Sequence, residues 1–434
     1  MVMINMKNLA SVCWKITCDD CRRMKMNLDK KRWIVLFAGC FINLCLGSIY
    51  AWSVFSSAMA DYFNSSMGMN VTPGDLAIVY TIANSVGPIT MISGGWFNDK
   101  FGPKKVILVG GIMWGLGMFL SGFATSIGYL IASYGILGGL GLGMAYGSTI
   151  STCVKFFPDK RGLIGGITTA VYGFSSVILP PIVTVVVSHS DATFAFKAVG
   201  IAFIILIAIS SMFLEQCPDG YKPAGYETVA VAKGSESINL NWKGMLKTPV
   251  FYIMLFLLTC GAFTGMMIIS QASAVAQNMV GMTAVAASLA VSALALFNAL
   301  GRIAAGFISD KIGRINTLTV ACVLAIIGLL CLFNSGEGTV GLFYVGLSIV
   351  GISFGSFMGV YPGFTADQFG PKNNSVNYGI MFIGFALAGY FGPQIMRNIF
   401  ESDGAYANAF IIAIGFSIVG VVFTCLYRIV TRNK

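Results

Sequence analysis

Twelve long apolar stretches alternate with short polar segments along the chain. A helix needs about 20 mostly apolar residues to cross a hydrocarbon core of about 30 Å, and the stretches have this length. The pattern therefore predicts an all-α membrane protein with twelve transmembrane helices. The predicted spans cover residues 33–55, 75–97, 105–124, 127–154, 162–187, 194–214, 248–276, 284–308, 317–334, 339–361, 376–398 and 405–427.

The longest polar segment inside the chain, residues 215–247, separates six predicted spans from six. None of the polar segments is long enough for a soluble domain, and the spans show no nucleophile–base pair, so we expect no enzyme. The expected organisation is a basic tail at 1–32, a six-helix bundle at 33–214, a central loop at 215–247, a second bundle at 248–427 and a short tail at 428–434.

Charged residues make up 10% of the chain, against about 25% in an ordinary soluble domain. The net charge of +10 is unevenly placed, because 24 of the 27 Lys and Arg residues lie in the two tails and in the loops after spans 2, 4, 6, 8 and 10. Such asymmetry marks the cytoplasmic side of a membrane protein. We expect a protein of the plasma membrane with both termini in the cytoplasm and the lipid bilayer as its surroundings. The charge therefore does not indicate a nucleic-acid partner.

Arg302 is the one basic residue that this topology leaves without a membrane surface. It lies in the stretch 284–308, which contains no Asp, Glu, Lys or His, whereas Lys197 and Arg397 fall at the outer ends of their spans. A charge near the bilayer centre costs about 2.5–3.5 kcal/mol on insertion scales, and no other predicted span has an acidic residue in its interior. The pattern favours an anionic substrate as the partner of Arg302. The alternative is an Arg that bonds the backbone carbonyls of a broken helix.

Asn298 precedes Arg302 by four residues and shares its helical face. An Arg fork binds a carboxylate with two bonds, and an Asn amide can donate to a hydroxyl group or accept from it. The pair predicts recognition of a small hydroxy or keto acid. Aromatic residues in the spans are candidates for the wall of the site, although each could instead serve helix packing: Tyr50, Tyr146, Tyr172 and Tyr361.

A loop motif occurs twice, 211 residues apart, after span 2 and again after span 8. It reads G-x-x-x-D-K-x-G and is followed by basic residues. The first Gly permits close approach of two helices, the Asp can accept from the N-terminus of a neighbouring helix, and the second Gly permits a tight turn. We predict a conformational gate formed by Gly95, Asp99, Lys100, Gly102, Gly306, Asp310, Lys311, Gly313 and Arg314.

Cysteine usage predicts neither a metal site nor a cofactor. Cys13, Cys18 and Cys21 cluster in the basic tail, but no fourth ligand is evident, and the expected cytoplasmic side disfavours disulfides. We expect no metal and no cofactor. Met24 or Met26 is a candidate start of translation, because the apolar organisation begins only afterwards.

The duplicated motif in a six-plus-six chain resembles that of the major facilitator superfamily of secondary transporters. The resemblance covers the chain from Trp33 to Tyr427. It implies two pseudo-symmetric six-helix halves that enclose a substrate site near the membrane midplane and rock around it. Transporters of this fold commonly work as monomers, so we expect a monomer.

Four further runs resemble the oxalate/formate antiporter-like branch, which includes bacterial lactate and other monocarboxylate transporters. These runs are Gly47–Phe55, Asn298–Arg302, Ala366–Gly370 and Asn377–Gly379.

The resemblance to this branch implies roles for individual residues. It implies that Arg302 binds the substrate carboxylate, and that Tyr50, Tyr146 and Tyr172 match tyrosines of the branch. Oxalate carriers of the branch also use a Lys in span 11, and its position falls here on Phe385. This departure puts oxalate in doubt as the substrate.

With one interior cation, the predicted site suits one carboxylate, since the second charge of a dianion would stay unpaired. The sequence therefore predicts a secondary transporter of small monocarboxylates, L-lactate or a close relative. On the resemblance alone we expect proton-linked transport, although the predicted spans offer no buried Asp, Glu or His to carry a proton. The alternatives are an oxalate/formate exchanger, an exporter of other organic anions or drugs, and, outside transport, a sensor or an intramembrane enzyme.

Overall fold

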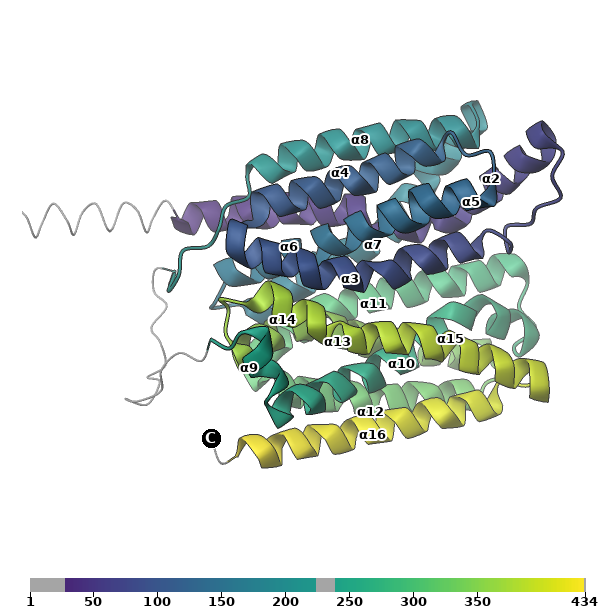
Figure 1. The fold of residues 1–434 in the computed structure, drawn as a ribbon. Coiled ribbons are helices and arrows are strands. Elements are labelled where there is room, and N and C mark those ends of the chain that lie inside the picture. The colour runs from purple at the N-terminus through teal and green to yellow at the C-terminus, as the bar shows by residue number, and fades with distance from the viewer. Residues whose placement is uncertain (1–27, 224–238, 433–434) are drawn as a thin grey trace, which may run out of the picture.

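The computed structural model describes residues 28–223 and 239–432. In these residues twelve helices are long and apolar enough to cross a membrane, and they run side by side in Figure 1. This is the all-α, twelve-helix arrangement that the sequence predicts. The spans are Leu28–Met67, Ala77–Phe101, Pro103–Ser121, Ile127–Phe156, Arg161–His189, Ala192–Met212, Pro249–Asn278, Val285–Ile312, Arg314–Phe333, Val340–Phe369, Asn374–Asp403 and Ala407–Thr431.

The helices form two bundles, the first purple to teal and the second green to yellow in Figure 1. A short helix, α9 (Trp242–Leu246), lies between them in the sequence. After its first helical segment, the first bundle contains η1 (Gly47–Ala51), α2 (Trp52–Met67), α3 (Ala77–Phe101), α4 (Pro103–Ser121), α5 (Ile127–Leu130), η2 (Ile131–Gly138), α6 (Gly139–Phe156), α7 (Arg161–His189) and α8 (Ala192–Met212). The second contains α10 (Pro249–Asn278), α11 (Ala284–Ile312), α12 (Arg314–Phe333), α13 (Val340–Phe369), α14 (Asn374–Met381), α15 (Ile383–Asp403) and α16 (Ala407–Thr431).

Helix ends follow local sequence signals. At the start of α8 the Asp191 carboxylate accepts from the backbone N–H of Phe194 at 2.7 Å, which satisfies one of the free donors of the first turn. Helix α10 begins with Pro249, whose fixed φ suits the first helical position. Helices α2 and α15 end at Gly68 and Gly404, both with positive φ, which glycine adopts without strain. These signals set where each span turns back.

The first span is longer than the sequence predicts. Its apolar run ends near residue 55, but the helix continues to Met67, because Met59 and Phe63 on α2 still face the core of the first bundle. The helix tightens into the 3₁₀ segment η1 where it meets α7: a Cβ at Gly47 would lie 2.1 Å from the Tyr172 carbonyl oxygen. The extension also adds the exposed Asp61, so this span does carry an acidic residue in its outer part.

Two other spans are irregular. Span 4 contains the π-helical segment η2, and span 11 breaks at Phe382, between α14 and α15. Every residue of α14 is buried, whereas α15 has several exposed apolar residues, among them Tyr390 and Phe391. The break thus separates a short buried helix from the longer outer part of the span.

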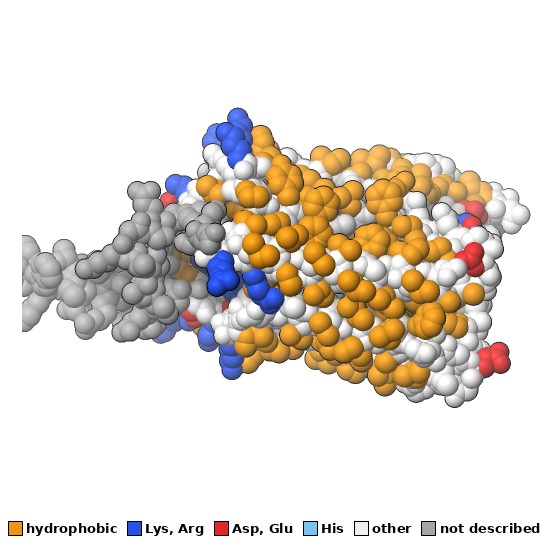
Figure 2. Space-filling model, turned by 90° about the horizontal axis from the view of Figure 1, so that it is seen from below, with side chains coloured by type: hydrophobic (Ala, Val, Ile, Leu, Met, Phe, Trp, Pro, Cys, Tyr) orange, Lys and Arg blue, Asp and Glu red, His pale blue; other side chains and the backbone are white. Residues whose placement is uncertain are grey.

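The surface carries the pattern of a multi-pass membrane protein. Figure 2 shows hydrophobic side chains over the middle of the molecule and most of the Lys and Arg at one end, whereas Asp and Glu are more prominent than Lys and Arg at the opposite end. We call the end that carries Lys100, Lys155, Arg161, Arg314 and Lys372 the basic end. The structure does not describe residues 1–27. The predictions for Cys13, Cys18 and Cys21, and for a start of translation at Met24 or Met26, therefore lie outside the described residues.

Candidate functional site

Arg302 lies on α11, eight residues before Asp310 and so about 12 Å from it along the helix. Its side chain is buried, with the residue 3% exposed. The Nε atom donates to Asn298 Oδ1 at 3.1 Å, and Nη1 donates to the backbone carbonyl of Thr169 on α7 at 2.6 Å. Among the described residues Arg302 forms no ion pair. The guanidinium is therefore held by two neutral oxygens only.

Glycines fix the backbone of Arg302 between two other helices. A Cβ at Gly166 on α7, or at Gly359 on α13, would lie 2.3 Å from the carbonyl oxygen of Arg302. One turn earlier, a Cβ at Gly355 would lie 2.1 Å from the Asn298 carbonyl oxygen. Only residues without a side chain allow this approach, so the glycines set the depth and direction from which the Arg302 side chain starts.

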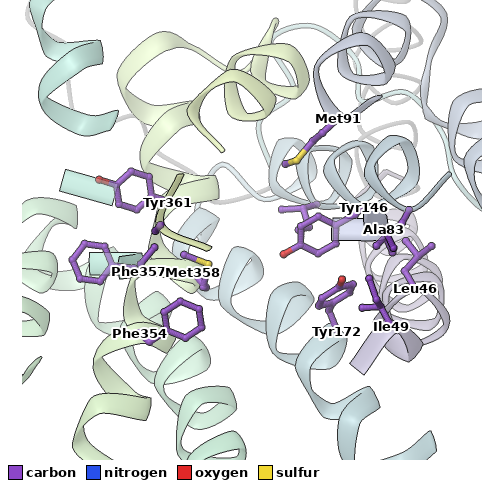
Figure 3. Packing of buried hydrophobic residues seen from close by; sticks show 14 of the residues in the cluster. Leu46, Ile49, Ala83, Met91, Tyr146, Tyr172, Phe354, Phe357, Met358 and Tyr361 are labelled. Carbon is purple, nitrogen blue, oxygen red and sulfur yellow. The ribbon is translucent and has the colours of Figure 1, made fainter. Parts of the chain in front are cut away.

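Three of the predicted tyrosines lie together, and two of them are near Arg302. The ring centroids of Tyr50 and Tyr172 are 5.4 Å apart, and those of Tyr146 and Tyr172 are 4.6 Å apart. Figure 3 shows Tyr146 and Tyr172 close to each other. The Arg302 guanidinium interacts electrostatically with the side chains of Tyr146 and Tyr172, and also with Tyr378. Helices α6 and α7 of the first bundle thus present phenols to a cation of the second.

An aromatic chain continues from these tyrosines into the second bundle. The ring centroid of Phe382 lies 6.0 Å from Tyr146, and Phe385 stacks on Phe382 at 4.4 Å. Phe354 on α13 follows at 6.4 Å from Phe385. The half-buried Phe385 is therefore an apolar part of this wall, next to the break in span 11.

Tyr361 lies apart from this cluster. Its hydroxyl donates to the Met254 carbonyl of α10 at 2.8 Å, and its ring stacks with Phe357 at 6.1 Å. Figure 3 shows Tyr361 and Phe357 away from Tyr146 and Tyr172. Here Tyr361 ties α13 to α10 inside the second bundle, which is the helix-packing alternative that the sequence left open.

Sequence reasoning did not select three groups that the fold brings to Arg302, which are the Thr169 carbonyl, Gly173 and Tyr378. It also did not select Phe382, which the fold brings to Tyr146. Tyr378 had a signal, because a Tyr within the run Asn377–Gly379 is polar and lies in a predicted span. A backbone carbonyl leaves no trace in the sequence, and Phe382 is one of 33 phenylalanines, so its position at the break carries no sequence signal.

A shallow hollow lies along α2 and α7. Residues Tyr50, Ser53, Ser57 and Asp61 recur at helical spacing along η1 and α2 and are all exposed. The hollow has a volume of about 490 Å³ and a mixed lining of Ser53, Val54, Ser57, Ala58, Asp61, Thr184 and Val187. Its exposed hydroxyl groups and carboxylate suit contact with water rather than with lipid.

The first copy of the loop motif joins α3 to α14. The Asp99 carboxylate accepts from the backbone N–H groups of Ser375 at 3.4 Å and Val376 at 3.1 Å, and Lys155 pairs with it at 2.6 Å. A Cβ at Gly95 would lie 2.6 Å from the Ser375 carbonyl oxygen. The Asp therefore caps the N-terminus of a helix in the other half, as the sequence suggests for this residue type.

The second copy joins α11 to α7 in the same manner. The two oxygens of Asp310 accept from the backbone N–H groups of Gly162 at 2.9 Å and Leu163 at 2.8 Å. Arg314 Nη1 lies 2.6 Å from Asp310, and a Cβ at Gly306 would lie 2.3 Å from the Gly162 carbonyl oxygen. The two motifs are thus related contacts across the interface of the halves.

The remaining motif residues shape the turns. Gly102 and Gly313 follow α3 and α11 with φ of 85° and 89°, which a residue with a side chain rarely adopts. Lys100 lies 4.8 Å from the ring of Trp96, and Lys311 lies 4.3 Å from the ring of Phe307. Both Lys side chains therefore stand on aromatic rings outside the hydrogen-bonded network.

The second copy has an extension that the first lacks. Asp367, at the end of α13, accepts from Arg314 Nε at 2.9 Å and from Arg161 Nη1 at 2.6 Å. Arg161 belongs to the first half, so this pair also crosses the interface. In the described residues, the hydrogen bonds between the halves lie at the basic end, with one exception, the bond from Arg302 to Thr169. The structure is closed at the basic end.

No group of three or more His, Cys, Asp or Glu side chains in the described residues is placed to hold a metal ion. A comparison with protein families matches residues 36–393 to the Major Facilitator Superfamily. The chain belongs to the major facilitator superfamily. The twelve-helix architecture, the paired bundles and the duplicated loop are therefore those of a transporter of this superfamily, embedded in a membrane as a multi-pass protein.

Two relatives have names that give small organic anions as their substrates. The chain is 29% identical to the oxalate:formate antiporter of Oxalobacter formigenes over 88% of each chain. It is 24% identical to monocarboxylate transporter 13 of Bos taurus over 75% of this chain and 74% of that one. Among solved structures, the Escherichia coli fucose:proton symporter matches with a TM-score of 0.67 at 13% identity, over 91% of this chain and 98% of that one, which supports the fold.

Asp310→Asn is expected to open the basic end of this major facilitator protein. Both carboxylate oxygens of Asp310 accept from backbone N–H groups. An Asn amide has one oxygen that can accept, and its NH2 group would face the second backbone N–H, to which it cannot bond. The loss of one charged hydrogen bond, about 1.5–3 kcal/mol, shifts the population by about tenfold or more. Distances between spin labels at Lys160 and Ile312 measure this population. Asp75→Asn, in the exposed loop at the opposite end of the molecule, where the carboxylate bonds only to Thr72 in its own turn, is the matched control. An unchanged distance distribution in Asp310→Asn would argue against a gate at this contact.

Proposed function

We propose that this transporter moves small monocarboxylates and that Arg302 binds the substrate carboxylate. The buried guanidinium carries the proposal, because it has two neutral protein acceptors and no ion-pair partner among the described residues. A guanidinium has five N–H donors, so three remain for a ligand. A charge buried in this way is costly until an anion joins it. The names of the relatives, a monocarboxylate transporter and an oxalate:formate antiporter, support the same substrate class.

The surroundings of Arg302 favour one carboxylate over two. Tyr146 and Tyr172, together with Phe382 and Phe385, which continue from Tyr146, give a mostly apolar wall with phenol groups as polar points. No second basic side chain joins this wall in the described residues. A monocarboxylate with a hydroxyl or keto group, such as L-lactate, would pair its charge with Arg302 and leave its short carbon chain against aromatic rings.

Transport follows from the two-half arrangement. By the distribution of Lys and Arg, we infer that the basic end and both termini face the cytoplasm of a plasma-membrane protein, so the state seen here is closed to the cytoplasm. We infer that substrate approaches from outside by way of the shallow hollow along α2 and α7. Rocking of the halves would break the contacts of Asp99 and Asp310 and open the site inward.

Coupling has two candidates. Proton-linked transport is the expectation from family resemblance. Exchange of one anion for another is favoured by the surroundings of Arg302. Its described hydrogen-bond partners are an amide and a carbonyl, and the groups that it interacts with electrostatically are tyrosines, with no carboxylate or His to carry a proton.

The deciding experiment is uptake of labelled L-lactate by proteoliposomes. One set is given an inward proton gradient, and a second is preloaded with unlabelled lactate at equal pH. Accumulation in the first set supports proton-linked transport, and stimulation only in the second supports exchange. Absence of lactate uptake in both, or stronger competition by oxalate than by unlabelled lactate, would count against the proposed substrate.

Phe385→Lys is expected to add oxalate to the substrates. The new ammonium group would enter the aromatic wall opposite Arg302 and supply a partner for a second carboxylate, while it costs affinity for a monocarboxylate. We expect oxalate competition to strengthen by about tenfold or more, the equivalent of one charged contact. Phe385→Met controls for the loss of the ring. If the Lys variant binds oxalate no better than the Met variant, Phe385 does not set the charge preference.

A further inference from the structure

The bond from Arg302 to the Thr169 carbonyl joins the two halves at the level of the site. Arg302 belongs to α11 of the second half and Thr169 to α7 of the first, and Nη1 lies 2.6 Å from the carbonyl oxygen. All other hydrogen bonds between the halves in the described part of the chain lie at the basic end. Arg302, the residue proposed to bind the substrate, thus also connects the two halves that must move relative to each other.

The geometry of α7 explains why this tie forms. Gly166 holds the Arg302 backbone against α7, so the side chain can reach a carbonyl less than one turn further along that helix. A Cβ at Gly173 would lie 3.8 Å from Arg302 Cζ and 4.0 Å from Nη1. Because this point is nearer the central carbon than the nitrogens, Gly173 lies over the flat face of the guanidinium rather than beyond its edge. Helix α7 therefore covers one face of the Arg302 guanidinium and places the Thr169 carbonyl at its edge.

Resting on the proposed function, we propose that the Thr169 carbonyl competes with the substrate carboxylate for Arg302, and that substrate binding releases this tie. A carbonyl offers a neutral dipole, whereas a carboxylate brings a full charge and two oxygens that match the guanidinium fork. Exchange of the first for the second keeps the buried cation paired throughout. The guanidinium needs only to turn away from Thr169, because its backbone stays fixed between α7 and α13.

This competition links binding to movement. In the empty transporter the tie adds to the contacts at the basic end and holds the halves in the state seen here. Substrate removes the tie and so favours reorientation. By linkage, any change that weakens the tie tightens substrate binding by the same factor and also frees the empty transporter to reorient. The Thr169 carbonyl therefore suppresses movement without substrate.

A backbone ester tests the proposal without touching any side chain. Replacement of the peptide bond between Thr169 and Ala170 by an ester weakens the Thr169 carbonyl as an acceptor. We expect the apparent KM for lactate to fall by about three- to tenfold, as for partial loss of one charged hydrogen bond. Net efflux of labelled lactate into lactate-free buffer should rise relative to exchange. The matched control is an ester between Ala170 and Val171, which weakens a carbonyl that does not contact Arg302.

The outcomes separate this proposal from the proposed function. Equal KM and equal net efflux in the two esters, with exchange retained, overturn the competition and leave lactate transport by Arg302 intact. No lactate transport by the unmodified protein overturns the proposed function instead. Should the Thr169 ester fail to fold, spin labels at Lys160 and Ile312 in the otherwise unmodified transporter provide a second measurement. Saturating lactate should lower the population closed at the basic end, and an unchanged population also overturns the proposal.

Discussion

Arg302→Lys is expected to lower kcat/KM for lactate by about 100-fold or more, measured as initial uptake into proteoliposomes. The Arg side chain donates to Asn298 through Nε, and it offers its terminal N–H groups to the Thr169 carbonyl in the empty state and to the carboxylate when substrate is bound. A single ammonium group cannot reach all three positions in that geometry. Loss of two charged hydrogen bonds, at about 1.5–3 kcal/mol each, corresponds to at least this factor.

Arg397→Lys is the matched control for this change. Arg397 lies exposed near the outer end of α15 and pairs with Glu401 at 2.6 Å, so the same substitution there should leave uptake nearly unchanged. Thermal unfolding in detergent checks that both variants are folded. If a folded Arg302→Lys variant transports as well as Arg397→Lys, the role of Arg302 is the structural one, an Arg that bonds carbonyls between helices.

Asn298→Asp is expected to make lactate transport depend on pH. Oδ1 of Asn298 already accepts from Arg302 Nε at 3.1 Å, so an isosteric carboxylate would form an ion pair there and compete with the substrate. At neutral pH the apparent KM should rise by about 100-fold. Since substrate binding then requires protonation of the new carboxylate, the KM should fall by about tenfold for each pH unit of acidification.

The unmodified protein should show a flat profile of KM against pH between about pH 6 and 8 if exchange is its mechanism, because no described contact of Arg302 is a carboxylate or His.

Asn334→Asp controls for the added charge. Asn334 is exposed at the end of α12, and its amide donates to the Leu330 carbonyl at 2.7 Å. A negative charge there should change the KM little and leave the profile flat. A pH-independent Asn298→Asp variant would show that Asn298 does not control the charge balance of Arg302. A steep profile in the unmodified protein would instead favour proton-linked transport.

The sequence by itself determined the membrane architecture, because lipid imposes strict rules. Each span must be about 20 apolar residues long, so the alternation of apolar and polar stretches defines twelve helices. The contacts of the duplicated loop could also be predicted, since Asp99 and Asp310 lie at helix ends where a carboxylate has few partners other than a helix N-terminus. Arg302 could be singled out from its stretch alone, because a charge in a membrane interior demands an explanation.

Tertiary structure alone decided what surrounds Arg302. Packing through Gly166 and Gly359 brings α7 and α13 to its backbone, and this places the Thr169 carbonyl, a group without a sequence signature, on the guanidinium. The same packing draws Tyr50, Tyr146 and Tyr172 together and directs the Tyr361 hydroxyl to α10 instead. The hydrophobic periodicity and the composition of a span show which of its residues the helix could present to the interior of the protein. Which inward residues meet depends on how closely two helices approach, and that is set by contacts between residues far apart in the chain.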